Sequence, residues 1–101
     1  MSEETRAPYV FRGTALPEHL RESLDAYAKD GRPTGGFLQA CIENDLTMAI
    51  RHGDDGNVVL MHVIVGYLYN ECPHECWGAK GKFDKWIEAK RNERLKKETK
   101  Q

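Results

Sequence analysis

The hydrophobic residues of this chain fall into four groups, and each group predicts a helix. In the first, Leu20, Leu24 and Tyr27 recur at helical spacing, with polar residues between them. Pro17 suits the first position of this helix, and Gly31 suits the position just after its end. The predicted helices span about residues 17–30, 36–52, 56–71 and 80–97.

The third group, residues 57–71, is the most apolar part of the chain and should form the centre of the fold. A helix that is apolar on all sides belongs in a protein interior, and this one is too short to cross a membrane. Its β-branched residues would also suit a buried strand, so an α+β fold with residues 58–69 as a strand is the alternative. The pattern favours an all-α fold, a compact four-helix domain with a buried third helix.

Length and composition refine this organisation. A chain of 101 residues forms one domain. We expect an extended N-terminal arm over residues 1–16, a helical domain over 17–89 and a basic C-terminal extension over 90–101. The formal net charge of −1 excludes a strongly basic nucleic-acid-binding protein. The first residues lack the apolar region of a signal peptide and three cysteines are too few for a disulfide scaffold, so the cytoplasm is the expected compartment.

Several short signatures recur along the chain: residues 17–20, 34–38, 44–46 and 67–70, then Trp77-Gly78 and Trp86. At these separations they resemble a family of small proteins of unknown function encoded by tailed bacteriophages and prophages. The resemblance covers residues 17–87 and implies a phage accessory protein that acts in the cytoplasm of a bacterial host. It carries over no catalytic residue, and it does not extend to the basic residues after Ile87.

An interaction site is expected around Trp77, which follows the third helix in a loop. Phe83 and Trp86 lie on the only apolar face of their helix, so a place in the core explains them. Trp77 has no such explanation and is the first choice for an exposed contact with a partner. His74, Tyr69 and Asn70 complete the predicted interaction site. The expected partner is a host or phage protein, and a homo-oligomer is a further option.

Asp45 and His62 form a second candidate pair. Asp45 falls on the apolar stripe of its helix, and His62 is the only acidic or basic residue between Val58 and Tyr69. If the two faces meet, the carboxylate would hydrogen-bond the imidazole as a buried polar pair that fixes the helix register. The same pair would be half of an acid–base site, but no nucleophile with a recognisable setting accompanies it. We therefore predict no catalytic residue.

Two further groups supply alternative functions. Cys72, His74 and Cys76 could provide three zinc ligands, although their spacing is not that of a standard zinc knuckle; two buried thiols and a surface histidine are preferred, with no cofactor. Lys90, Arg91, Arg94 and Lys97 could contact phosphates of nucleic acid, although Glu93 and Glu98 dilute their charge.

The leading expectation for function is a non-enzymatic phage accessory protein. It would bind a host or phage macromolecule, for example to inhibit a host defence or regulatory component. A small nucleic-acid-binding regulator and a zinc-binding protein are the alternatives.

Overall fold

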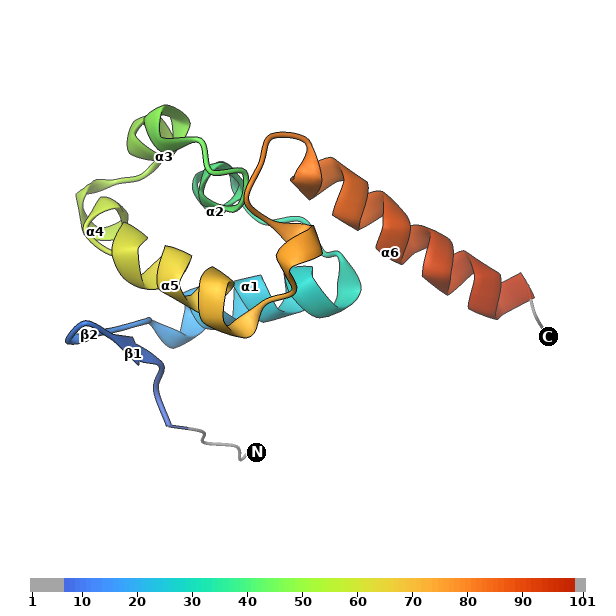
Figure 1. The fold of residues 1–101 in the computed structure, drawn as a ribbon, viewed down its shortest axis with the longest axis horizontal. Coiled ribbons are helices and arrows are strands. Elements are labelled where there is room, and N and C mark those ends of the chain that lie inside the picture. Colours follow the sequence, from blue (N-terminus) through green and yellow to red (C-terminus); the bar gives the residue numbers. More distant parts are fainter. Residues whose placement is uncertain (1–6, 100–101) are drawn as a thin grey trace.

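The computed structural model describes residues 7–99, and this part of the chain is predominantly helical (Figure 1). The all-α prediction is confirmed, and the strand alternative for residues 58–69 is wrong. None of the described helices is long and apolar enough to cross a membrane. In chain order the elements are β1 (Val10–Phe11), β2 (Thr14–Ala15), α1 (Glu18–Asp30), α2 (Gly36–Ile42), α3 (Leu46–His52), α4 (Asp55–Val58), α5 (Met61–Glu71), the 3-10 helix η1 (His74–Cys76) and α6 (Lys82–Thr99).

The first and last predicted helices form close to their expected bounds, as α1 and α6. α1 ends at Gly31, whose φ of 70° is left-handed and therefore favours glycine. The N–H of Gly31 donates to the carbonyl of Tyr27, 2.9 Å away. α6 packs against η1 and α1 near its start and then extends away from the rest of the molecule (Figure 1).

The prediction of one helix over residues 36–52 is wrong, because the chain turns between α2 and α3. Asn44 adopts a left-handed conformation with a φ of 60°, which asparagine tolerates better than most residues. Asp45 then caps α3 by accepting a hydrogen bond from the backbone N–H of Met48 at 3.2 Å. The apolar period of residues 37–50 would place Leu46 and Ile50 in the core of a single helix. Because the turn changes the direction of the chain, they are instead 67% and 51% exposed.

The third predicted helix is also interrupted. Asp54 caps the short α4 by accepting from the N–H of Asn57 at 2.8 Å, and α5 begins three residues after α4 ends. The central position of α5 is confirmed, since Val63, Ile64 and Leu68 are fully buried. Its burial on all sides is wrong, because Tyr69 is 65% exposed.

The N-terminal arm folds into a hairpin where it is described, whereas residues 1–6 of the predicted arm lie outside the described part. Val10 pairs with Ala15 and Phe11 with Thr14 in antiparallel register. The turn between them uses a left-handed conformation at two successive positions, with φ values of 51° and 82° at Arg12 and Gly13. The hairpin lies against α5 (Figure 1).

Candidate protein-interaction site

A groove of about 550 Å³ lies where the hairpin, α5 and the segment after η1 meet. Three of the four predicted interaction residues, Tyr69, Asn70 and Trp77, line it. The fourth, His74, stacks on Tyr69 with ring centroids 6.3 Å apart. We call this hollow the aromatic groove; its lining is Phe11, Arg12, His62, Val65, Gly66, Tyr69, Asn70 and Trp77.

The end of α5 brings the aromatic residues of the groove together. Cys72 and Pro73 leave the helix in an extended conformation, and η1 turns the chain so that Trp77 lies beside the last turn of α5. The rings of Tyr69 and Trp77 meet edge to face, with centroids 6.3 Å apart and planes at 82°. These aromatic residues of the groove thus come from three elements: Tyr69 from α5, His74 from η1 and Trp77 from the loop that follows.

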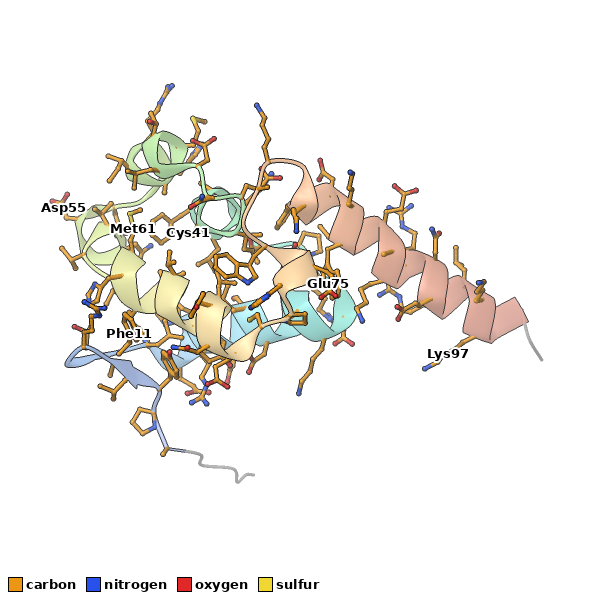
Figure 2. All side chains as sticks on the ribbon, viewed as in Figure 1. Phe11, Cys41, Asp55, Met61, Glu75 and Lys97 are labelled. Carbon is orange, nitrogen blue, oxygen red and sulfur yellow. The ribbon has the colours of Figure 1, made fainter. Side chains whose placement is uncertain are left out.

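The hairpin supplies the opposite wall of the groove. A Cβ atom at Gly66 would lie 2.8 Å from the ring of Phe11, so the glycine is what allows this ring to lie directly on α5 (Figure 2). Tyr9 anchors the same hairpin: its ring meets Tyr67 edge to face at 4.9 Å, and its hydroxyl accepts from the Asn70 amide at 2.9 Å. The hairpin is thus tied to α5 by aromatic packing and by a residue of the predicted interaction site.

The indole N–H of Trp77 is buried and has no hydrogen-bond partner among the described residues. A buried donor without an acceptor costs about 1–3 kcal/mol. The ring is half-buried and packs against the hydrophobic core, so the expectation of a fully exposed Trp77 is wrong. The loop after η1 folds back onto α5 and covers part of the ring.

Sequence reasoning missed five of the eight residues that line the groove. Phe11 and Arg12 are expected in an extended arm, His62 in a buried pair, and Val65 and Gly66 in the buried third helix. The hairpin could have been suspected from the apolar run of residues 9–11 and the glycine two residues after it, because Gly13 supplies the positive φ of a tight turn. Its contact with α5 joins residues far apart in sequence and leaves no local signal.

The predicted buried pair of Asp45 and His62 is wrong. The Asp45 side chain is the N-cap of α3, and His62 is exposed and lines the aromatic groove. The physical reason is the turn at Asn44, which converts a position on the expected apolar stripe into a cap position. The two residues line different hollows.

The alternative zinc site is also not formed. No group of three or more histidine, cysteine or acidic side chains within residues 7–99 could hold a metal ion. Cys72 and Cys76 are buried, whereas His74 is exposed. Burial raises the pKa of the Cys72 thiol to about 12 and those of Cys76 and Cys41 to about 11. Because the thiolate is the nucleophile and the metal ligand, these thiols are poorly suited to either role near neutral pH.

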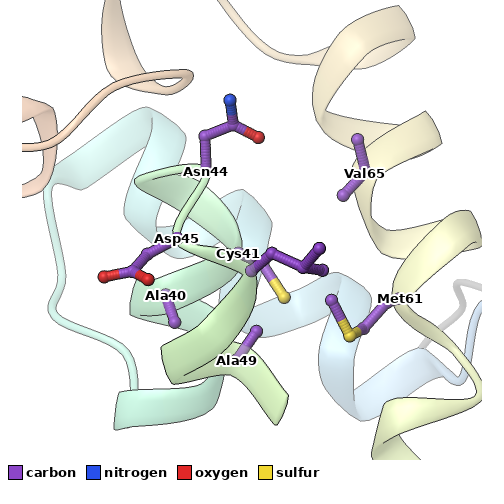
Figure 3. Close-up of a pocket in the computed structure, with 8 residues that line it drawn as sticks. Ala40, Cys41, Asn44, Asp45, Ala49, Met61 and Val65 are labelled. Atoms are coloured by element: carbon purple, nitrogen blue, oxygen red, sulfur yellow. The ribbon is translucent and has the colours of Figure 1, made fainter.

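A second hollow, of about 50 Å³, separates α2 and α3 from α5 (Figure 3). Cys41 and Ala49 on one side face Met61 and Val65 on the other, so its wall is apolar. It holds little more than a water molecule or two and offers few polar groups to fix a ligand.

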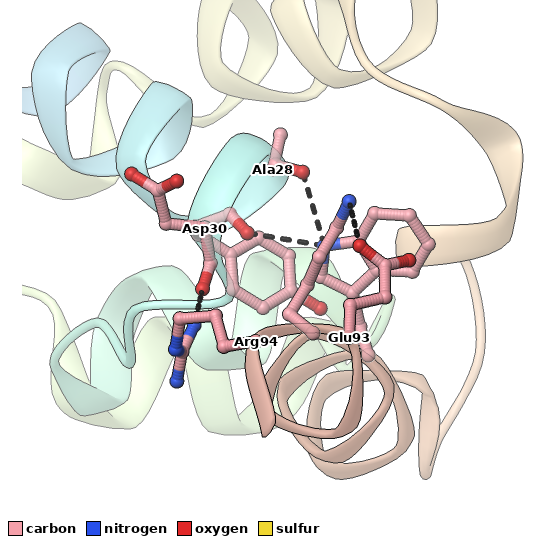
Figure 4. Close-up of polar contacts among 7 residues, drawn as sticks. Ala28, Asp30, Glu93 and Arg94 are labelled. Atoms are coloured by element: carbon pink, nitrogen blue, oxygen red, sulfur yellow. Dashed lines mark hydrogen bonds and ion pairs between the residues drawn. The ribbon is translucent and has the colours of Figure 1, made fainter. Parts of the chain in front are cut away.

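The basic residues of α6 are partly committed to the fold (Figure 4). The ammonium of Lys90 lies 4.9 Å from the ring centroid of Trp86 and 3.6 Å from the Glu93 carboxylate. Arg94 donates to the carbonyl of Asp30 at 2.7 Å, near the C-terminal end of α1. Arg91 and Lys97, the other two candidates for nucleic-acid contact, are exposed.

Comparisons of this chain with protein-family models, with curated proteins and with solved structures found no match.

Proposed function

We propose that this chain is a non-enzymatic phage accessory protein that binds a host or phage protein through the aromatic groove. The observation that carries the proposal is the convergence of Tyr69, His74 and Trp77 beside a groove of about 550 Å³. Aromatic side chains at the edge of a groove are typical of the residues that dominate binding energy in protein interfaces. The phage origin rests on the resemblance given by the sequence signatures.

The groove also has the properties of a preformed site. Its floor, around Val65 and Gly66, belongs to α5, whose other face is packed in the core. Anchoring to a rigid helix limits the conformational entropy that is lost on binding. A volume of this size is in the range that accommodates a few side chains of a partner.

The buried thiols support the non-enzymatic part of the proposal. Cys41, Cys72 and Cys76 are the strongest nucleophiles by residue type, and burial raises their pKa values well above neutral pH. The Asp45 carboxylate, the other candidate for chemistry, is engaged in capping α3.

Affinity purification with mass spectrometry tests the proposal. The bait would be the wild-type chain, a groove variant (Tyr69→Ala with Trp77→Ala) and a matched surface variant (Arg91→Ala with Lys97→Ala), each expressed in a bacterial host. We expect the wild-type chain and the matched surface variant on α6 to recover the same protein partner. The groove variant should not recover it, because interface aromatics often contribute about 2 kcal/mol or more each. A partner lost only by the α6 variant would contradict the proposal.

A further inference from the structure

The chemistry of the aromatic groove restricts what it can bind; this step rests on the proposed function. Arg12 is the one fully charged side chain in the lining, and His62 is the one further titratable base. The lining, all of it within the described residues, contains no carboxylate. Glu71 and Glu75 are exposed on the neighbouring turns but do not line the groove. The field inside it therefore favours a negatively charged ligand group.

The position of Arg12 sets where such a group would lie. Arg12 occupies the turn of the hairpin, at the rim, and its guanidinium lies 5.2 Å from the centroid of the Phe11 ring. A guanidinium over a ring presents its N–H donors sideways, in a geometry that matches a carboxylate. A carboxylate bound to Arg12 would therefore lie next to the apolar floor of the groove.

The remainder of the groove favours an apolar side chain. Phe11, Val65 and Trp77 provide carbon surface, and Gly66 lets the Phe11 ring lie close against α5. His74 lies against one face of Tyr69, so at most one face of this ring is free to stack on a nucleic-acid base. One guanidinium is also too little positive charge to follow a phosphate backbone.

We infer that the aromatic groove binds an acidic peptide segment of its protein partner, in which an aromatic or aliphatic anchor is flanked by aspartate or glutamate. The anchor lies on the floor between Phe11 and Trp77, and a neighbouring carboxylate accepts hydrogen bonds from Arg12. The partner is thereby recognised by a short linear segment.

Selection from a random peptide library against the full chain tests this inference. We expect the selected peptides to carry Asp or Glu beside Trp, Phe or Leu. Amide replacement of the acidic residues in a selected peptide should weaken binding by about tenfold or more, the equivalent of one charge-assisted hydrogen bond. Arg12→Gln should cause the same loss for the acidic peptide and none for its amide counterpart. Arg91→Gln, on exposed α6, is the matched control and should change neither.

The outcomes separate this inference from the proposed function. Neutral or basic peptides whose binding depends on Tyr69 and Trp77 would overturn the acidic specificity and leave the groove as the interaction site. Equal binding of the acidic peptide by the wild-type chain and by the Arg12→Gln variant would do the same. If a single-stranded oligonucleotide displaced the peptide from the groove, the ligand would be a nucleic acid rather than a peptide, and the inference would be wrong. Selected peptides that all bind independently of Tyr69 and Trp77 would overturn both the inference and the proposed function.

Discussion

Two aromatic clusters in this protein contain similar residues but differ in their hydrogen bonding. The cluster that we call the buried cluster consists of the buried Tyr27 and Phe83 and the partly buried Trp86. Tyr27 and Phe83 stack with centroids 5.2 Å apart, and the Tyr27 hydroxyl donates to the carbonyl of Cys76 at 2.7 Å. The Trp86 indole donates to the carbonyls of Tyr27 and Ala28, at 3.0 and 3.2 Å (Figure 4). Each hydrogen-bonding group on these rings has a partner, and that partner is backbone.

The groove cluster of Tyr69, His74 and Trp77 has ring contacts but little hydrogen bonding. Tyr69 is exposed, and the buried N–H of Trp77 has no partner among the described residues. Buried polar groups in a folded protein are normally satisfied, so the buried cluster contributes to stability. In the groove cluster the Trp77 N–H does not follow that rule, and the Tyr69 ring contributes little buried area. Matched substitutions in the two clusters should therefore have different effects.

The largest difference is expected between Tyr27→Ala and Tyr69→Ala. Truncating Tyr27 removes a fully buried ring and leaves the carbonyl of Cys76 without its donor, at a cost of about 3–5 kcal/mol in the free energy of unfolding. Truncating Tyr69 should change it by less than about 1 kcal/mol, because the ring is mostly exposed. Urea denaturation of both variants measures the difference. Equal destabilisation would mean that the groove cluster is part of the core.

Alkaline pH should lower the free energy of unfolding, because two buried thiols lie beside the buried cluster. Burial raises the pKa of the Cys72 thiol from 9.0 to about 12 and that of Cys76 from 9.0 to about 11. Above about pH 9 the unfolded chain releases these protons while the folded chain retains them, so the free energy of unfolding falls as the pH rises. The loss should be on the order of 4 kcal/mol by about pH 10.5, roughly 2 kcal/mol from each thiol.

Urea denaturation at several pH values measures this loss. The groove variant with Tyr69→Ala and Trp77→Ala serves as the control, and its stability should fall with the same slope. A flat profile above about pH 9 would contradict the assignment of the loss to the buried thiols.

The elements that carry the aromatic residues could be predicted from sequence, whereas the walls of the groove could not. Phe83 and Trp86 are three residues apart on a helix with one apolar face, and this spacing indicates burial. Trp77 lies outside any such pattern, which indicates a loop. The wall formed by Phe11 depends on how the hairpin packs on Gly66, and that contact is set by tertiary structure rather than by periodicity.

The break at Asn44 shows a second limit of sequence patterns. The apolar period from Phe37 to Ile50 continues across the break, so periodicity alone predicts one helix. The deciding signals are local: Asn44 tolerates a left-handed conformation, and Asp45 is a good N-cap. Both signals are short, and the longer apolar pattern masks them. The same pattern places Asp45 on an apolar face and so leads to its incorrect pairing with His62.

Gly66→Ala should separate the two walls of the groove at moderate cost. The new methyl group would lie 2.8 Å from the Phe11 ring, so the hairpin must move, at a cost of about 1–3 kcal/mol. The matched control is Gly56→Ala in α4, whose Cβ would meet only the Asp54 carboxylate at 3.6 Å and should be neutral or slightly stabilising. Thermal denaturation measures both variants. No difference between them would mean that Phe11 is not held against α5.

The smallest effect and the most direct comparison come from the same substitution in each cluster, Trp86→Phe and Trp77→Phe. At Trp86 the change removes a donor shared by two backbone carbonyls, and we expect a loss of about 1–2 kcal/mol in the free energy of unfolding. At Trp77 the change removes a buried donor that has no partner among the described residues, which should stabilise the fold. This gain should offset the contact area lost with the smaller ring, so the free energy of unfolding should stay within about 1 kcal/mol of wild type. Urea denaturation of the two variants side by side gives the difference. Because both variants lose the same atoms, the difference between them reports the hydrogen bonding of the two indoles rather than their size. Equal losses of the free energy of unfolding would show that the Trp77 N–H is hydrogen-bonded in solution. The two clusters would then differ only in the exposure of Tyr69.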